Sequence, residues 1–495
     1  MDCHLPAVSR SILRLAPLTA AVLMAFGSPI GLTNASAQDA ELLRKLNAPY
    51  ARVADSAKSA TKLFTAVLDM TKPPAPIGED FNQTTIYPGM DGFAAWANWA
   101  AANEGIGKAL IECQGMQVLG VPYGTAGVDP KFVERGLVIE VGSGGDLSEV
   151  RLPYLAALES VSAYVATDMY RLCEAGQFEQ AFATGMAHLR VLRQACDAQM
   201  YEEKLAAMTM LADAFSVHRD VLYGYQEKMP LELLKKLSLK EYPFLKASDT
   251  ERLKRIELPE GDLYVAEAMI ASVFGSDGQV ADDRFKKTFA GLQSAGQPLT
   301  GFGASKRWER IANVHGSREA SMQKLNAIYD DWWRRWRLPA YGPMMAAPTA
   351  LSKTNPVKYA AVVLSVADID ALFALRRRLV AEFCGTACAA GIVSYHKELG
   401  VWPDDIKKAY TQFFPKRFNF DPYDKDYGSF RFESLGTRAR GVETEFGRVD
   451  VTGCMLYARN DDNQFSGATR HAEGGRADDF VLWPALRAIS RGQGK

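Results

Sequence analysis

Histidine is the side chain that most often moves protons or binds metals near neutral pH, and this chain of 495 residues contains six. His4 lies in the N-terminal leader, and the other five are scattered along the chain at His188, His218, His315, His396 and His471. No His-Glu-x-x-His sequence sets two histidines and a glutamate on one helix face, as a zinc hydrolase of that type requires. The histidines therefore predict no catalytic centre.

Carboxylate pairs and glycine-rich loops give no stronger signal. Asp282-Asp283, Asp330-Asp331 and Asp404-Asp405 are adjacent in sequence, and adjacent side chains diverge on a helix or a strand. Gly142-Ser-Gly-Gly145 lacks the spacing of a nucleophile elbow and predicts a turn. Gly301-Phe-Gly-Ala-Ser305 is too short for a phosphate-binding loop. We predict no catalytic and no cofactor-binding residue, and we favour a protein that is not an enzyme.

Six cysteines follow the leader: Cys113, Cys173, Cys196, Cys384, Cys388 and Cys454. An even number permits disulfides in an oxidising compartment. One prediction is a Cys173–Cys196 bridge that clamps two helices, and the alternative is that the cysteines are buried apolar thiols. Cys384 and Cys388 share a helix face, but helix geometry rarely lets such a pair bridge. No histidine or third cysteine lies near them with zinc spacing.

Aromatic and basic side chains alternate in a predicted helix from about Ser317 to Arg337, at Tyr329, Trp332, Trp333, Arg334, Arg335, Trp336 and Arg337. Such a cluster could sit at a membrane surface or stack on sugars or bases. The favoured interpretation is a core stripe whose arginines reach outward to water.

The elements that must hold these residues begin after a leader. Arg10 and Arg14 precede a short apolar run, and Ala35-Ser-Ala37 has the small-x-small pattern of a signal cleavage site. The apolar run is short for a bilayer, which needs about 20 residues. We expect residues 1–37 to be a signal peptide and the protein to be exported, either periplasmic or extracellular. The alternative is an anchor that is not removed.

Composition is that of a globular protein, with 48% hydrophobic and 23% charged residues. The formal net charge of -1 excludes a global field toward nucleic acid or an anionic membrane, although local patches remain possible. We expect an unknown protein partner in the envelope, no nucleic acid, and no transmembrane segment once the signal is removed. The length predicts more than one domain, and we divide the chain after the leader into domains of residues 38–355 and 356–495.

Apolar residues at helical spacing predict a mainly α fold of irregular multi-helix type. Helices are expected over 39–70, 93–110 and 152–225, and a long one over about 356–399, with an irregular excursion or small hairpin near 115–150. Gly176 lies between two apolar helical stripes and predicts the turn of an αα-hairpin. No second copy at a repeat period was found, so no repeat array is predicted.

The C-terminal part has the clearest organisation. Short strands are expected at 429–434, 453–458 and 480–483, and acidic residues fill the loop between the last two. The layout is a long helix followed by a small antiparallel sheet with an acidic loop.

This layout resembles the C-terminal part of the major pseudopilin of type II secretion. That family has a Tyr…Gly-x-(Tyr/Trp)-Pro turn, an Asp-Pro motif, a Tyr-Ser-x-Gly-x-Asp-Gly loop and a closing Asp-Ile. The corresponding stretches here are Tyr395…Gly400-Val-Trp-Pro403, Asp421-Pro422, Tyr457-Ala-Arg-Asn-Asp-Asp-Asn463 and Asp479-Phe480. The likeness covers about a quarter of the chain. A looser likeness, to long exported helical bacterial proteins of unassigned function, covers most of it.

The resemblance implies a calcium ion in the acidic loop, because calcium takes six to eight oxygens from carboxylates and carbonyls. Asp462 matches the loop aspartate, Asp479 matches the closing one, and the backbone oxygen of Arg459 is a third donor; further oxygens nearby belong to Asn460, Asp461 and Asp478. Ala458 and Asn463 replace the usual Ser and Gly, although Asn463 tolerates a left-handed turn. The alternative is that these carboxylates solvate a turn or cap strands.

A pseudopilin begins with an apolar helix that carries an early glutamate, whereas here the module follows a long helical region. The chain is therefore not expected to be a pilin subunit, and three hypotheses remain. The favoured one is a non-enzymatic exported envelope protein, a helical interaction scaffold whose C-terminal module is stabilised by calcium. The second is a hydrolase of envelope polymers with converging Asp and Glu residues. The third is an accessory of a secretion or pilus-like machine, which an exposed apolar patch beside the sheet would favour.

Overall fold

The computed structural model describes residues 37–75, 81–142, 150–241, 256–275, 278, 280, 310–338, 341–367, 369–426, 428–444, 447–460, 463–468 and 479–492. This part of the chain is mainly helical, with a small antiparallel sheet near the C-terminus after a long helix. The predicted fold class is therefore confirmed. Residues 1–36 of the expected signal peptide lie outside the described residues.

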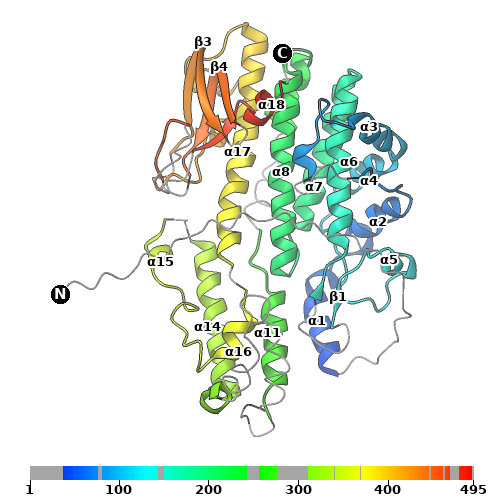
Figure 1. The fold of residues 1–495 in the computed structure, drawn as a ribbon, viewed down its shortest axis with the longest axis vertical. Helices are drawn as coiled ribbons and strands as arrows, with labels where there is room; N and C mark the ends of the chain where they lie inside the picture. Colours follow the sequence, from blue (N-terminus) through cyan, green and yellow to red (C-terminus); the bar gives the residue numbers. More distant parts are fainter. Residues whose placement is uncertain are drawn as a thin grey trace, which may run out of the picture.

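The body is built on helices that run along the longest axis of the molecule: α6 (Tyr154–Glu174), α7 (Phe178–Ala195), α8 (Tyr201–Tyr225) and α17 (Asp370–Leu399). Helix α8 lies between α17 on one side and α6 and α7 on the other (Figure 1). The middle of α6 is buried on every side from Val161 to Tyr170, and its three polar residues there, Ser162, Thr167 and Asp168, all form hydrogen bonds.

The αα-hairpin predicted at Gly176 joins α6 to α7. Gly176 has φ 75°, the left-handed conformation that glycine adopts without strain. The amide of Gln177 donates to the carbonyl of Leu172 at 2.8 Å, and that of Gly176 donates to Cys173 at 3.0 Å. These two bonds close a helix end in a Schellman motif, so this prediction is confirmed.

Three of the predicted helices are interrupted. The helix expected over 39–70 is split into α1 (Ala37–Ala51) and α2 (Ala60–Leu68), because Lys58 between them pairs with Val118 in a β-bridge. The helix expected over 93–110 becomes α3 (Phe93–Ala102) and α4 (Gly105–Cys113).

The long helix expected from about residue 356 begins only at Asp370, after the separate short helix α16 (Ala360–Ser365). The amide of Ala361 in α16 donates to Nε2 of His315 at 3.1 Å, so a long-range contact fixes the first turn of α16. The helix start therefore depends on tertiary structure that apolar spacing does not report.

Shorter elements complete the helical part. The excursion predicted near 115–150 contains a two-stranded antiparallel hairpin, which confirms that prediction. The elements are η1 (Asp55–Ala57), η2 (Gln83–Thr85), α5 (Pro130–Glu134), β1 (Glu140–Val141), β2 (Val150–Arg151), α9 (Leu231–Lys236), η4 (Leu237–Glu241), α11 (Gly261–Ser272), α14 (Arg318–Arg337) and α15 (Pro343–Ala346).

The C-terminal sheet has the order β3-β4-β5 and is antiparallel throughout. The three predicted strands are present, and the first two are longer than expected because they form one extended hairpin. After η5 (Ile406–Ala409) and η6 (Lys416–Phe418) come β3 (Arg431–Thr444), β4 (Gly447–Ala458), β5 (Phe480–Trp483) and α18 (Leu486–Ser490). The sheet stands beside the upper part of α17, with α18 between the sheet and α8 (Figure 1).

One hydrophobic core runs from Leu42 to Trp483 and is continuous across residue 355, where we expected a domain boundary. Helix α17 lies close to its neighbours at two glycines. A Cβ atom at Gly385 would lie 2.5 Å from Leu482, and one at Gly391 would lie 2.3 Å from Phe414. The sheet therefore packs against the helical body, with a small second core of its own around Val451 and Met455.

All six cysteines are buried thiols in the structure, which forms no disulfide among them. The predicted Cys173–Cys196 bridge is therefore wrong. Both thiols lie in the apolar interior, where burial raises the pKa of each to about 12. The alternative prediction of buried apolar thiols is the one observed.

The aromatic-basic helix α14 is a core stripe, as favoured. Tyr329, Trp332 and Trp336 are buried, and the Nε1 of Trp336 donates to the carbonyl of Ile256 at 2.8 Å. Arg335 does not reach outward: it is buried and bonded to the carboxylate of Asp331 at 3.0 Å. None of the described helices is long and apolar enough to cross a membrane.

Candidate functional site

The predicted calcium loop is only partly within the described residues. Asp461, Asp462 and Asp478 lie outside them, so their positions relative to Asp479 are not described. Asp479 is buried, and its Oδ2 accepts the backbone amides of Ser466 at 2.9 Å and Ala468 at 2.6 Å. A carboxylate with these bonds caps a turn, which is the alternative function that we considered for it.

Two residues of the predicted loop, Asn460 and Asn463, lie within the described residues and bond to each other. The carbonyl of Asn460 accepts the amide of Asn463 at 2.8 Å, and Asn463 has φ 57°, the expected left-handed conformation. The Oδ1 of Asn463 accepts the amide of Lys425 at 3.1 Å. Among the described residues no cluster of three or more His, Cys, Asp or Glu could hold a metal ion.

The side chain of Arg459, beside this loop, forms ion pairs that were not predicted from the sequence. The guanidinium of Arg459 bonds to Asp424 at 2.5 Å and lies 3.5 Å from Asp421. The backbone amide of Arg459 also donates to Asp421 at 3.0 Å, and its guanidinium stacks on Phe465. The aspartate of the Asp-Pro motif therefore ties the end of β4 to the segment after α17.

A second polar cluster surrounds Glu203 in the first turn of α8. The fully buried Glu203 carboxylate accepts the hydroxyl of Tyr154 at 2.7 Å, the hydroxyl of Tyr123 at 2.5 Å and the amide of Met200 at 3.3 Å. The oxygen of Tyr123 accepts the amide of Gln199 at 2.8 Å. Burial raises the pKa of Glu203, and the three donors oppose that shift.

A second carboxylate lies at the same helix end. The Oδ2 of Asp262 in α11 accepts the amide of Tyr201, the first residue of α8, at 2.6 Å. The amide of Gly261 donates to the carbonyl of Gln199 at 2.8 Å, so the N-termini of α8 and α11 meet here. Burial raises the pKa of Asp262 to about 7, and the negative charge of Glu203 adds to this shift.

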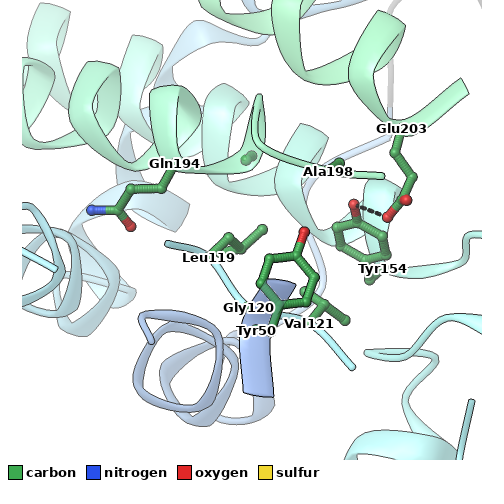
Figure 2. A pocket seen from close by; sticks show the side chains of 9 residues that line it. Tyr50, Leu119, Gly120, Val121, Tyr154, Gln194, Ala198 and Glu203 are labelled. Atoms are coloured by element: carbon green, nitrogen blue, oxygen red, sulfur yellow. Dashed lines mark hydrogen bonds between the residues drawn. The ribbon is translucent and has the colours of Figure 1, made fainter. Parts of the chain in front are cut away.

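A small cavity adjoins the Glu203 carboxylate. It measures about 10 Å³, which is about enough for one water molecule. Figure 2 shows the Tyr50 ring between Gln194 on one side and the hydrogen-bonded pair of Tyr154 and Glu203 on the other. The remaining lining residues are Leu119, Gly120, Val121, Ala195 and Ala198. The arrangement can hold a water or a proton, and it has no room for a polymer substrate.

A third polar cluster joins α8 to α17. Arg219 of α8 is 5% exposed and bonds to the Glu382 carboxylate of α17 at 2.5 Å and to the Thr386 hydroxyl at 2.9 Å. Arg378 lies 3.6 Å from Glu382 and 3.1 Å from Asp213 of α8. Burial acts to lower the pKa of Arg378, but the two carboxylates raise it overall. These ion pairs fix the two helices against each other.

The same face of α8 also holds the C-terminal helix α18. Asp220 bonds to Arg487 at 2.5 Å, and Arg487 also donates to Ser216 at 3.0 Å. Arg491 lies 3.9 Å from Asp220, donates to the carbonyl of Thr84 at 2.8 Å and stacks on the ring of Tyr87. We call the ion pairs of Arg219, Arg378, Arg487 and Arg491 with Asp213, Asp220 and Glu382 the arginine clamp.

Two of the scattered histidines come together in the interior. The Nε2 of His188 lies 3.0 Å from the Ser162 hydroxyl, and repulsion from His218 adds to the burial that lowers the pKa of His188 to about 3. Burial likewise lowers the pKa of His218 to about 3. A buried imidazole with so low a pKa stays neutral at physiological pH and serves packing and hydrogen bonding.

Sequence reasoning missed Glu203, Asp262 and the arginine clamp. A glutamate three residues after the helix boundary is a weak local signal for Glu203, and the others have none. Glu203 meets Tyr123 from 80 residues away, and Arg219 meets Glu382 from 163 residues away.

Comparison of the chain with protein-family models, with curated proteins and with solved structures found no match.

Proposed function

We propose that the protein is a non-enzymatic exported envelope protein that acts as a helical interaction scaffold for a protein partner. The observation that carries this proposal is the arginine clamp, which attaches α17 and α18, and with them the C-terminal sheet, to α8. Removing either partner of a buried ion pair is strongly destabilising, so the clamp opposes movement of one part against the other. A scaffold needs this rigidity, because a partner must meet surfaces at fixed positions.

The surface that we assign to the partner lies at the end of α17, beside the sheet. Leu399 is 51% exposed and Val401 is 58% exposed, on the two sides of the helix-ending Gly400. The next residue, Trp402, packs on Gly453 of β4. Exposed aliphatic side chains on a fixed turn gain free energy when a partner covers them. An apolar patch beside the sheet is also what we expected of an accessory of a secretion or pilus-like machine, which is the second candidate.

Calcium binding in the acidic loop remains part of the proposal. The left-handed Asn463 and the turn that it closes on Asn460 support a loop of the required shape. Calcium there would stabilise the far end of the sheet, while Arg459 bonds to Asp421 and Asp424 without it.

If the protein hydrolysed envelope polymers, Glu203 and Asp262 would be the candidate catalytic carboxylates. A polymer cannot reach Glu203 through a cavity that holds about one water, and Asp262 accepts the first amide of α8, so we assign both carboxylates a structural function. Incubation of the purified protein with envelope polymer should release no soluble fragments. Release that is lost in Glu203→Gln would refute the scaffold proposal.

The direct test places a photo-crosslinking residue at Val401 in the full chain, with Lys131 as the matched exposed control on α5. In envelope fractions, the probe at Val401 should give one discrete crosslinked protein, and the probe at Lys131 should not give it. Equal products from the two positions, or none from Val401, would contradict the assignment.

A further inference from the structure

Most of the large hydrophobic side chains that are exposed among the described residues belong to one stretch of the chain. Four of the seven large hydrophobic side chains that are exposed lie between residues 310 and 359: Val314, Leu338, Tyr341 and Val357. Val314 is 56% exposed and Val357 is 47% exposed. The two belong to adjacent segments, because the amide of Gly316 donates to the carbonyl of Lys358 at 2.8 Å.

The same stretch has a positive net charge, although the whole chain is almost neutral. Residues 310–359 contain eight Lys and Arg against three Asp and Glu, a net charge of +5 in a protein whose formal net charge is -1. One of the three acids, Asp331, is already bonded to the buried Arg335. Local electrostatics therefore differ from the neutral average of the whole chain.

Five basic residues lie within one to three helical turns of the two valines along the chain. Arg310 lies one helical turn before Val314, Lys353 lies four residues before Val357, and the set is completed by Arg318, Lys324 and Lys358. Among the described residues none of these five basic groups forms an ion pair with a carboxylate. We call the five basic residues with Val314 and Val357 the basic tip. It belongs to α14, α16 and the segments that flank them, at the end of the molecule opposite the sheet (Figure 1).

The contacts of Tyr359 favour a lipid surface over a nucleic acid as the anionic partner. The ammonium groups of Lys324 and Lys358 lie 5.6 Å and 5.7 Å from the centre of its ring. The two cations compete for the faces of this ring with a nucleic-acid base, whose stacking on an aromatic ring is the contact that single-stranded recognition uses. Exposed valines add nothing to a polyanion, but they gain free energy at the boundary between lipid headgroups and acyl chains.

We propose that the basic tip docks on the surface of an anionic lipid bilayer, with its ammonium and guanidinium groups on lipid phosphates and Val314 and Val357 among the headgroups. The basic tip lies apart from the patch at Leu399 and Val401 and does not depend on the proposed scaffold function. Either proposal can fail while the other stands.

The test measures co-sedimentation of the full chain with vesicles at 0.15 M salt (roughly physiological). Vesicles of phosphatidylcholine alone are compared with vesicles that also contain phosphatidylglycerol. A lysine near an anionic surface contributes about fivefold to affinity. Lys353→Glu with Lys358→Glu should therefore weaken binding to the anionic vesicles at least tenfold. The matched control, Lys72→Glu with Lys131→Glu, reverses two exposed lysines elsewhere and should change binding less than about twofold.

The apolar contribution has its own pair of variants. Val314→Ser with Val357→Ser should weaken binding about three- to tenfold, whereas Leu399→Ser with Val401→Ser, which are equally exposed, should leave it unchanged. Circular dichroism and melting confirm that each variant is folded.

Three results would overturn the proposal. One is equal binding to the two kinds of vesicle, or to neither. Another is equal weakening by the two lysine pairs, which would show a response to net charge alone. The third is binding that ignores the valines and is abolished by a short single-stranded DNA, which would identify a polyanion as the partner.

Discussion

Replacing Glu382 by glutamine removes one charge from the interior with little change in shape. Arg219, 5% exposed, then has no carboxylate to balance its charge, and Arg378 loses one of its two carboxylates. Breaking a buried ion pair by removing one partner destabilises a protein by about 3–5 kcal/mol. We therefore expect Glu382→Gln to destabilise the fold by about that amount.

The corresponding change in melting temperature follows from the size of the protein. Unfolding entropy is about 2.1 cal/mol/K per residue, which amounts to about 1 kcal/mol/K for the residues after the leader. Glu382→Gln should therefore lower the melting temperature by about 3–5 °C at a fixed scan rate. The control is Asp404→Asn, whose ion pair with Lys408 is solvent-exposed on both sides and should produce no measurable shift.

A double variant separates the charge from the packing. Arg219→Met with Glu382→Leu replaces both partners by apolar side chains of similar volume and should recover most of the lost stability. The reasoning fails if Glu382→Gln shifts the melting temperature no more than Asp404→Asn does. It also fails if the double variant is less stable than Glu382→Gln.

Three further predictions concern titration and metal. His188 and His218 are neutral in the fold, with pKa values of about 3, but they take up protons near pH 6.5 when the protein is unfolded. The contribution of these histidines to the free energy of unfolding should therefore be complete above pH 6.5 and fall as the pH drops from 6.5 toward 3. The double variant His188→Gln with His218→Gln should flatten this loss in urea titrations at about pH 7 and about pH 4.5. The pKa of Asp262 is raised from 3.8 to about 7, so the wild type should lose stability relative to Asp262→Asn as the pH rises from 4 through 7, and a constant difference between the two would refute this. Calcium should raise the melting temperature, and Asp462→Ala with Asp479→Ala should abolish the rise; a chelator without effect on the wild type would end the calcium proposal.

The elements that were predicted correctly are those whose signals lie within a few residues. Gly176 ends α6 because glycine alone enters the left-handed region without strain. The C-terminal strands follow from β-branched and aromatic runs bounded by turn residues, and Asn463 adopts the left-handed conformation expected of it. Fold class was therefore accessible from the sequence.

The errors of prediction arose where a distant segment competes with local propensity. One helix was predicted over 39–70, but α1 ends at Ala51 and α2 begins at Ala60, with Lys58 between them in a β-bridge to Val118. Cys173 lies at the turn end of α6 and Cys196 caps the far end of α7, so the hairpin keeps the two thiols apart and they form no bridge. Helical spacing tells which face of a helix is apolar, and it does not tell where a particular side chain on that face lies relative to the next helix.

The sequence by itself determined that the chain is mainly helical, that a small antiparallel sheet follows the last long helix, and where several helices end. Only the tertiary structure decided which polar groups meet: Glu203 with Tyr123 and Tyr154, and Arg219 with Glu382. Helix and strand signals are local because they arise from backbone geometry and from periodicities of 3.6 and 2 residues. A buried ion pair between residues 163 positions apart depends on how whole helices pack, and no local pattern encodes that distance.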